Sequence, residues 1–532
     1  MSHHATSPLP ILRTNLLRLR KTAPLKRVLP LLLALLLFTV ATVYLSTSPL
    51  RPLSLAPPPL FGLTPLQQDV RQATAATYRL YLRHCLGKDE IVPTTRRCED
   101  WFNIGLTLLD SLDTLLLMDL RDEYRQSRDW ADRHLSFDAV STRVSTFEIV
   151  IRATAGMNSA YQLTGDLLWR RKSVELADYL LLSFNLTATG CPPPAAFIGR
   201  ARLAMSDEHA LDTLHSNPAE AGTLQLEFRT LSQITGDPKY ARAVDRCTDS
   251  LIRAMPAQQF LVTDRFNLQT GVFEGARVSM SAMVDSFYEM QLKTWVAFGK
   301  KDHHLRDAFQ AAVARAHVLL FRTEHNHTYV GEMLRGNTLS FKRSMEHLAC
   351  FLPGTLAYAA LHGLGGGLQG ENPDDYLPLA RALAESCYAM SRGMFHGLAA
   401  EVTDFSGDTP RPMRGADHNL LRPEIVEALY YLDKIDPLAG DKYKKWGETM
   451  WKAMKTYAQV PGQPDGVLSS TYNLLAQTKE EITLHGKLHS FAIAETYKYL
   501  FMLFDDRPPD QQTLPLTKWV YNTEAHPVRI VE

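Results

Sequence analysis

Residues 159–172 read SAYQLTGDLLWRRK, and Gly165 and Asp166 inside this stretch separate two runs in which apolar residues recur at helical spacing. A glycine can take the left-handed backbone conformation that ends a helix, and an aspartate can accept amide hydrogens at the start of the next helix. The stretch therefore predicts two consecutive helices joined by a tight turn.

The same glycine-aspartate pair recurs farther along the chain. It lies in TLSQITGDPKYARAV (230–244), where Pro238 suits a first helical position, and more loosely around Gly440 in YYLDKIDPLAGDKYKKW (430–446). No sustained alternation of apolar and polar residues indicates a sheet. The pattern predicts an all-α domain of helical hairpins, which can close into an α/α barrel or remain an open α-solenoid.

The N-terminal region has the charge pattern of a membrane anchor. Residues 1–27 carry arginines and lysines but no acidic residue, and residues 28–46 carry no charge. Such a segment is long enough to cross a hydrocarbon core of about 30 Å. A cleaved signal peptide is the alternative, but its apolar region is shorter. By the positive-inside rule, we expect a cytosolic basic tail and a type II transmembrane signal anchor.

The region after this segment divides into a short stalk and one large domain. Residues 47–65 are rich in proline, which favours extended backbone over helix or sheet. Residues 66–532 contain no second stretch that resembles a linker, so we expect a single lumenal domain.

Cysteines and net charge narrow the possible compartments and partners. All six cysteines lie in the expected lumenal part, which suits an oxidising compartment, and no C-x-x-C pair indicates zinc or redox chemistry. Asn185-Leu-Thr and Asn326-His-Thr are glycosylation acceptors if they are lumenal. The formal net charge is +0, and no basic stripe argues for nucleic acid.

Acidic residues inside apolar helical runs indicate a catalytic site. Glu148 lies in STFEIVIRATAG, where burial would raise the pKa of its carboxyl group and favour a proton donor. Arg152, one turn later, would oppose that shift. Asp285 and Glu289 repeat the pattern on one face of a helix.

Glu424 has a different predicted environment. In NLLRPEIVEALYYL it falls in the first turn of a helix, where the dipole favours the ionised form that a general base requires. A glycoside hydrolase needs two carboxyl groups in opposite protonation states, and these environments would separate the pKa values of Glu148 and Glu424. Each of these carboxylates taken alone is more often a structural ion pair or a capping group.

Seven ordered segments resemble the successive motifs of the class I α-1,2-mannosidases, glycoside hydrolase family 47. They cover the chain from about Ala73 to Pro527 and read WFNIGLTLLDSLDTLLLM, FEIVIRATAGMNSAYQLTGD, EAGTLQLEFRTLSQITGD, VDSFYEMQLK, MEHLACFLPGTLA, LRPEIVEALYYL and YNTEAHP. The resemblance implies an (αα)7 barrel that binds Ca2+. It also implies hydrolysis of terminal α-1,2-linked mannose from high-mannose N-linked glycans on glycoproteins, with inversion at the anomeric carbon.

The resemblance also assigns roles to individual residues. It implies Glu148 as the proton donor, with Asp285 and Glu424 as the other catalytic acids and Glu424 as the preferred base. It implies that Thr523 holds Ca2+ through oxygen atoms, which this hard cation prefers. It places these residues at the substrate: Arg152, Glu220, His347, Phe351, Arg422, Glu427 and Glu524.

The resemblance matches Cys350 and Cys387 to a family disulfide. Cys85 with Cys98 is a plausible second bridge, although the sequence does not fix connectivity. The chain departs from the family in GKLHSFAIAETYKYL, where His489 replaces a cavity glutamate and Gly486 replaces an aspartate, and in SAMVDS before Asp285.

Two other functions remain open from the sequence. One is a glycan-binding quality-control factor in ER-associated degradation with slow or no hydrolysis, which His489 leaves possible because an imidazole cannot replace a carboxylate. The other is a non-catalytic α-solenoid scaffold. We expect an ER or Golgi membrane location with a lumenal catalytic domain, and the motifs do not show which mannose branch is trimmed.

Overall fold

The computed structural model describes residues 62–211, 213–336, 338–367 and 375–531. The predicted basic tail and membrane anchor, with most of the stalk, lie outside these residues. Within the described residues, no helix combines the length and apolar character needed to cross a membrane.

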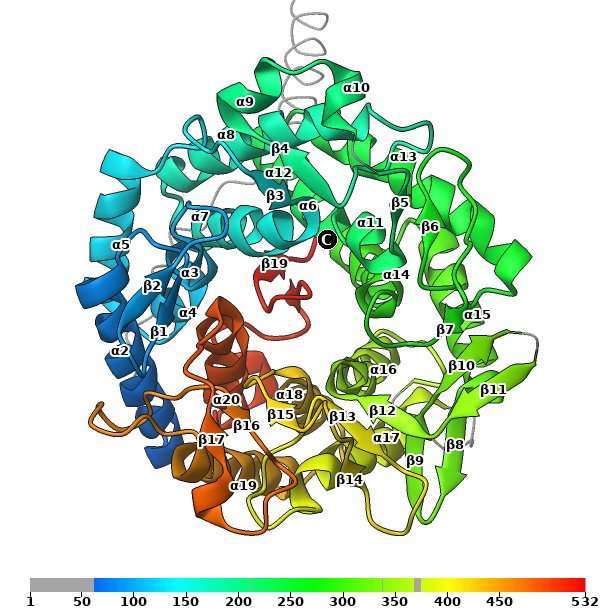
Figure 1. The fold of residues 1–532 in the computed structure, drawn as a ribbon. Helices are drawn as coiled ribbons and strands as arrows, with labels where there is room; N and C mark the ends of the chain where they lie inside the picture. The colour runs from blue at the N-terminus through cyan, green and yellow to red at the C-terminus, as the bar shows by residue number, and fades with distance from the viewer. Residues whose placement is uncertain (1–61, 212, 337, 368–374, 532) are drawn as a thin grey trace, which may run out of the picture. The chain divides into compact units, whose positions relative to one another are not determined.

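The described chain forms a ring of paired helices (Figure 1). Within it, each inner helix contacts the next one around the ring, and the turn that leads into α20 contacts α4, so the ring closes. The seven inner helices are α4 (Leu112–Leu117), α7 (Ala155–Thr164), α12 (Gln225–Thr235), α14 (Asp285–Ala297), α16 (Phe351–Leu361), α18 (Glu424–Ile435) and α20 (Tyr497–Leu503).

An outer helix precedes each inner helix along the chain. The outer helices are α2 (Pro65–Cys85), α5 (Arg121–His134), α8 (Leu167–Phe184), α13 (Lys239–Ala254), α15 (His303–Leu319), α17 (Tyr376–Arg392) and α19 (Lys442–Tyr457). Inner helices are buried on nearly every side, whereas outer helices are buried on one face. This alternation confirms the predicted (αα)7 barrel and rules out the open solenoid.

The glycine-aspartate turns behave as predicted at two of three places. Gly165 ends α7 with a φ of 73°, and the Asp166 carboxylate accepts the Leu168 amide hydrogen at 3.0 Å. Gly236 ends α12 with a φ of 79°. Gly440 also has a positive φ, but α18 already ends at Ile435, so Gly440 lies in the loop before α19. There, the prediction of a helix end at the glycine is wrong.

Short strands accompany the helices, which the sequence analysis did not predict. They form two- and three-stranded antiparallel sheets. Each has only 2 to 4 residues, too few for the alternation that marks a strand in a sequence. The strands that cap one end of the barrel or join the helices are β1 (Glu90–Val92), β2 (Arg97–Glu99), β3 (Arg143–Ser145), β4 (Ala195–Phe197), β5 (His215–Ser216), β6 (Phe266–Asn267), β7 (Arg277–Val278), β8 (Phe321–Glu324), β9 (His327–Val330), β10 (Glu332–Arg335), β11 (Leu339–Lys342), β12 (Ser344–Glu346), β13 (Val402–Asp404), β14 (Arg411–Pro412), β15 (His418–Asn419), β16 (Thr471–Tyr472) and β17 (Thr483–Leu484).

The C-terminal hairpin fills the centre of the ring. Strands β18 (Trp519–Tyr521) and β19 (Pro527–Arg529) pair antiparallel, and Figure 1 shows this red segment inside the inner helices. Its residues are almost entirely buried. The last motif of the sequence therefore lies within the space that the inner helices enclose.

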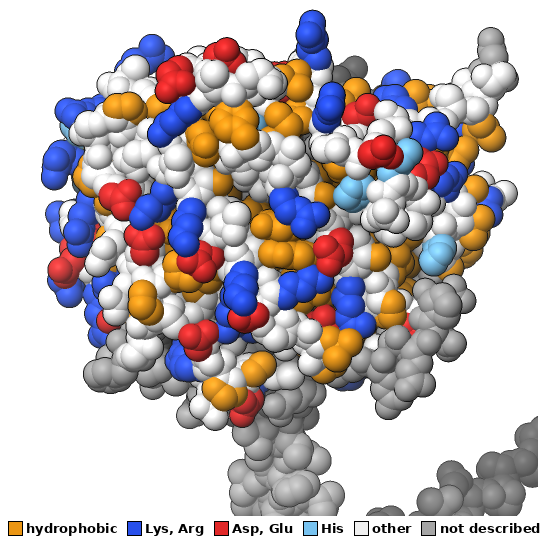
Figure 2. All heavy atoms as spheres, turned by 90° about the horizontal axis from the view of Figure 1, so that it is seen from below, with side chains coloured by type: hydrophobic (Ala, Val, Ile, Leu, Met, Phe, Trp, Pro, Cys, Tyr) orange, Lys and Arg blue, Asp and Glu red, His pale blue; other side chains and the backbone are white. Residues whose placement is uncertain are grey.

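Three disulfides tie neighbouring segments together. Cys350–Cys387 joins the start of α16 to α17, as the resemblance implied, and Cys85–Cys98 is also formed. The third bridge, Cys191–Cys247, closes a loop whose ends are 56 residues apart. On the face drawn in Figure 2, basic, acidic and apolar side chains are interspersed.

Candidate active site

A cavity of about 280 Å³ lies within the barrel. Its walls come from α6 (Thr146–Glu148), α11 (Pro218–Gly222), the inner helices α14, α16 and α18, and the turn between β18 and β19. Eight carboxyl groups line it, against two guanidinium groups. The carboxyl groups belong to Glu148, Glu220, Asp285, Glu289, Glu424, Glu427, Glu495 and Glu524.

The structure brings together most of the residues that the sequence placed at the site. The predicted residues on the cavity wall are Glu148, Arg152, Glu220, Asp285, Phe351, Arg422, Glu424, Glu427, Thr523 and Glu524. Asp285 and Glu424 are the first residues of α14 and α18, and Glu148 is the last residue of α6. Three helix ends therefore converge on one space.

His347 is the exception among the predicted residues. Its side chain is 1% exposed, and it does not line the cavity. It lies behind Glu424, with 3.7 Å between its Nε2 and the Glu424 Oε2. Burial is the main cause that lowers the pKa of His347 to about 3, so the ring is neutral. The prediction that His347 lines the cavity is wrong, because the 3-10 turn before α16 directs the ring into the protein.

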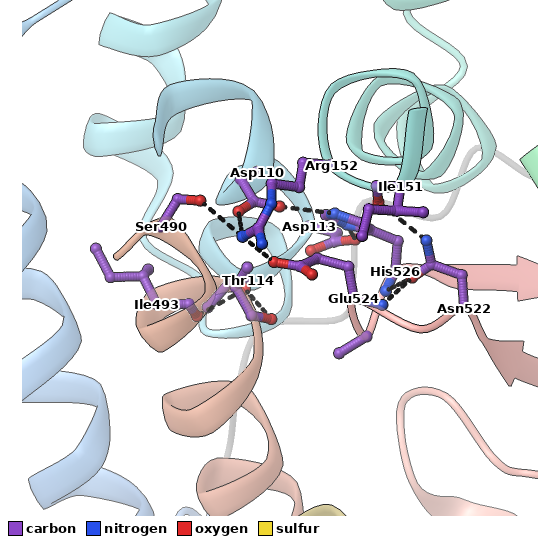
Figure 3. Close-up of polar contacts among 12 residues, drawn as sticks. Asp110, Asp113, Thr114, Ile151, Arg152, Ser490, Ile493, Asn522, Glu524 and His526 are labelled. Carbon is purple, nitrogen blue, oxygen red and sulfur yellow. Dashed lines mark hydrogen bonds and ion pairs between the residues drawn. The ribbon is translucent and has the colours of Figure 1, made fainter. Parts of the chain in front are cut away.

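Arg152 links the proposed donor to the base of the cavity. Its Nε donates to Glu148 Oε2 at 2.7 Å, and its Nη1 pairs with the Glu524 carboxylate. Figure 3 shows the same guanidinium group directed at Asp110 and Ser490. The Glu148 side chain is 28% exposed. Glu148 is thus held by an ion pair and partly open to solvent, rather than enclosed by apolar neighbours as the sequence predicted.

The other two predicted catalytic carboxyls are more deeply buried. Burial is the main cause that raises the pKa of Asp285 to about 7. Burial likewise raises the pKa of Glu424 to about 7, although the Arg422 guanidinium opposes the shift. Burial thus opposes the effect of the helix dipole, and Glu424 would be only partly ionised at neutral pH.

A buried lysine supports the cavity from behind. Lys293 is fully buried in α14, pairs with the Glu289 carboxylate, and lies 3.5 Å from Glu427. Burial would lower its pKa, but these two carboxylates raise it. Burial raises the pKa of Glu427, which Lys293 partly opposes. The ammonium group therefore balances part of the negative charge of the cavity.

Residues 73–530 match the family model for Glycosyl hydrolase family 47. The chain belongs to glycosyl hydrolase family 47. The match spans every inner helix and the central hairpin, so the family resemblance seen in the motifs is confirmed along the whole barrel.

Relatives within family 47 include endoplasmic reticulum mannosyl-oligosaccharide 1,2-alpha-mannosidases. The human protein of that name is 36% identical over 89% of this chain and 66% of its own length. The Schizosaccharomyces pombe protein of that name is 32% identical over 96% of this chain and 98% of its own length. This chain therefore spans about two thirds of the human relative and nearly all of the fission yeast one.

A solved family 47 structure has the same architecture. The alpha-1,2-mannosidase from Trichoderma reesei superposes with a TM-score of 0.76 over 88% of this chain and 99% of its own, at 23% identity. At this identity the likeness establishes the fold, the α/α barrel, and not the substrate.

The family 47 cavity contains residues that the sequence analysis did not select. Glu495 and Phe491 both line it. Glu495 lies in the apolar run FAIAETYKYL, and an acidic residue inside an apolar run is the same signal that singled out Glu148. Burial raises the pKa of Glu495, and the neighbouring carboxyl of Glu524 adds to the shift.

Two π-helical segments bear on the cavity. One covers Ile149–Thr154 and contains Arg152, and the other covers Ala492–Thr496 and contains Glu495. Such wide turns occur mostly as single insertions in helices, frequently at functional sites. They carry no residue signature, so they became visible only in the structure.

The family 47 cavity has donor atoms that suit Ca2+. Thr523 is partly exposed at its base, and burial raises the pKa of the adjacent Glu524, which Arg152 opposes. Oxygen donors and a surplus of carboxyl groups suit a hard divalent cation that keeps many of its waters. Within residues 62–531, apart from those left undescribed, no three His, Cys, Asp or Glu side chains form a compact metal-binding group. The cavity wall therefore offers oxygen donors, from Thr523 and from carboxyl groups, of the type that hard divalent cations prefer.

His489 lies beside the cavity wall and not on it. Its Nδ1 is 3.1 Å from Glu90 Oε1, and its ring stacks on Phe491 with centroids 5.1 Å apart. Both Arg152 and Arg422 lie over the same Phe491 ring. The sequence-based prediction that His489 occupies a cavity position is wrong, because the chain directs this side chain toward β1.

We expect His489→Glu to destabilise the protein. The new carboxylate would face Glu90, whose side chain is 7% exposed, and like charges at that distance repel each other. The free energy of unfolding should fall by about 1 kcal/mol, a typical value for a single substitution. Denaturant unfolding at pH 7 measures it. His489→Gln is the control, because its amide can still donate to Glu90, and equal stability of the Glu variant and the wild type would contradict the pairing.

Proposed function

We propose that this chain hydrolyses terminal α-1,2-linked mannose from high-mannose N-linked glycans, with inversion at the anomeric carbon. The cavity geometry is the main support. Three carboxyl groups from separate helix ends, those of Glu148, Asp285 and Glu424, face one space together with two arginines. The names of the human and fission yeast relatives indicate the same linkage and substrate class.

Glu148 is the proposed proton donor to the glycosidic oxygen. Arg152 holds its Oε2 by the 2.7 Å hydrogen bond, so Oε1 is left to carry the proton. The partly exposed position lets a sugar reach this oxygen from the cavity mouth. Protonation of the leaving oxygen is the general-acid step of glycoside hydrolysis.

Glu424 is the proposed general base, with Asp285 beside it. Glu424 Oε2 is buried and makes no hydrogen bond with any residue that the structure describes. A carboxylate with a pKa of about 7 is ionised in part at neutral pH and is a stronger base than an exposed one. It would take a proton from a water that attacks the anomeric carbon from the face opposite Glu148.

Ca2+ is the proposed cofactor, held by oxygen atoms of Thr523 and by water. When bound, it would orient sugar hydroxyls and water by charge and offset the negative charge of the cavity. Glu427, Glu495 and Glu524 would accept hydrogen bonds from water in this part of the cavity, as their positions on its wall allow. Burial raises the pKa values of these carboxyl groups, and a nearby cation would lower them again.

Residues 28–46 are the proposed type II anchor, with the barrel in the lumen of the ER or Golgi. Two observations support a lumenal barrel. All six cysteines are paired in disulfides, which persist in oxidising compartments. Relatives carry an endoplasmic reticulum designation in their names.

We expect the purified full-length chain to release mannose from a Man9 glycan when Ca2+ is present and to stop when a chelator is added. Chromatography of the labelled glycan would show stepwise loss of hexose, and proton NMR would show β-mannose as the first product. A glycan without α-1,2 linkages is the matched control and should remain unchanged. Failure to release mannose at any Ca2+ concentration would contradict the proposed activity.

The alternative of a glycan-binding factor without hydrolysis depended on His489. Since the structure places this side chain against Glu90 and outside the cavity lining, the substitution leaves all eight cavity carboxyls in place. No observation in the described residues therefore favours a non-hydrolytic factor over the enzyme.

A further inference from the structure

The turn between β18 and β19 has an unusual backbone. Ala525 has a φ of 59°, in the left-handed region that non-glycine residues seldom adopt. The Asn522 side chain accepts the amide hydrogens of Glu524 and His526 at 2.9 and 2.8 Å. This turn presents Thr523 and Glu524 to the cavity. The position of both residues therefore depends on what holds the turn.

A cluster of buried charges lies directly beneath this turn. His526 is within 3.0 Å of Asp110 Oδ1 and within 2.7 Å of Asp113 Oδ2, and Figure 3 shows its ring between the two carboxylates. Lys498 in α20 is 2.7 Å from Asp113 and donates to the Ala525 carbonyl oxygen at 2.8 Å. The lysine thus binds the strained residue itself.

The cluster is isolated from solvent. The side chains of Asp110, Asp113, Lys498 and His526 are 0 to 1% exposed. Burial would lower the pKa of His526, but the two carboxylates raise it to about 9, so the imidazole is charged at neutral pH. None of these groups reaches the cavity.

A gain in folding free energy does not by itself explain why these charges are buried. Taking charges out of water costs several kcal/mol for each ion, and well-packed apolar residues often serve as well or better. Buried ion pairs do fix a particular arrangement in some proteins. Here the buried charges contact the left-handed turn under the cavity, through the bond from Lys498 to the Ala525 carbonyl oxygen.

Arg152 connects the cluster to the proposed donor. It contacts Asp110 at 3.5 Å and Glu524 from one nitrogen, and Glu148 from another. A displacement of the turn would therefore also displace the hydrogen-bond partner of Glu148.

We propose that Asp110, Asp113, Lys498 and His526 are positioning residues that hold the Thr523–Glu524 turn in its cation-binding and substrate-binding conformation. Their part in cation binding rests on the proposed function, because Thr523 is the proposed Ca2+ ligand. Their part in holding the turn does not depend on it. The two parts have separate measurements.

Lys498→Met in the full-length chain tests the inference, with Lys434→Met as the matched control. Lys434 is also a buried lysine, 2.9 Å from the Asp433 carboxylate, and it donates to the Asp505 carbonyl oxygen at 2.9 Å. It does not line the cavity or contact the turn. Both variants lose a buried ammonium group, but only Lys498→Met loses the hydrogen bond to the Ala525 carbonyl oxygen.

Hydrogen exchange of the amides at 522–526 is the first measurement. We expect exchange in the turn to be about tenfold faster in Lys498→Met, because local opening becomes easier. Exchange in Lys434→Met should stay at the wild-type rate. Equal exchange in all three proteins would overturn the positioning role, whether or not the chain binds Ca2+.

Calorimetric titration with Ca2+ is the second measurement. Loss of a group that orients a metal ligand typically weakens metal binding by about 10- to 100-fold, and we expect this for Lys498→Met but not for Lys434→Met. An unchanged affinity would overturn the link to the cation. A wild-type chain that binds no Ca2+ would instead contradict the proposed cofactor, and exchange would still decide the positioning role.

Asp113→Asn is the second variant, for use if Lys498→Met does not fold. The asparagine oxygen can still face Lys498, but the amide nitrogen cannot accept from His526 Nδ1, so this variant loses the negative charge and the hydrogen bond to His526. We expect faster exchange at 522–526 in this variant too, and wild-type exchange would overturn the role of Asp113.

Discussion

Glu424→Gln is expected to reduce mannose release by at least about 10³-fold, because glutamine keeps the shape of the side chain but cannot accept the proton of the attacking water. The chain should remain folded, since Glu424 Oε2 makes no hydrogen bond with a described residue that the amide would break. Binding of Ca2+ and of uncleaved glycan should persist. Turnover of Man9 glycan at saturating substrate measures the effect.

Asp433→Asn is the control for Glu424→Gln. Asp433 lies on the same helix, α18, and burial also raises the pKa of its carboxyl group, but it is outside the cavity. We expect Asp433→Asn to keep wild-type turnover. Full activity of Glu424→Gln would exclude this residue as the general base, and would direct attention to Asp285.

Lys293→Met is expected to lower the free energy of unfolding by about 3–5 kcal/mol, the usual cost of removing one partner from a buried ion pair. The Glu289 and Glu427 carboxylates would lose their buried cation. Chemical denaturation of the variant and the wild type gives the difference.

The loss in Lys293→Met should depend on pH. Burial already raises the pKa of Glu427 above its ordinary value, and removal of Lys293 takes away a group that lowers it. A carboxyl group whose folded pKa is raised contributes its stability below the unfolded pKa and loses it as pH rises through the folded pKa. The deficit relative to wild type should therefore be smaller at pH 5 than at pH 8.

The double variant Lys293→Met with Glu289→Gln separates charge from packing. It removes one of the two carboxylates that the single variant leaves unpaired. We expect it to recover part of the lost stability. A double variant no more stable than Lys293→Met would show that lost packing, and not unpaired charge, causes the deficit.

Local rules predicted the elements of this fold well where the signal lies in neighbouring residues. Gly165 and Gly236 end helices as expected, because the left-handed conformation is a property of the residue itself. The short strands were missed because two to four residues do not establish a period. Gly440 was misread because tertiary packing ended α18 before it.

The sequence by itself determined the family, the hairpin repeat of the barrel, and most residues of the cavity wall, among them Glu148, Asp285, Glu424 and Thr523. Only the tertiary structure decided how His347 and His489 point and which carboxyls lose solvent. Burial and ion pairing depend on segments far apart in the chain, such as Glu90 with His489 and Lys498 with Ala525. A sequence motif predicts which side chains lie at the site. Their charge states depend on tertiary neighbours that lie outside the motif.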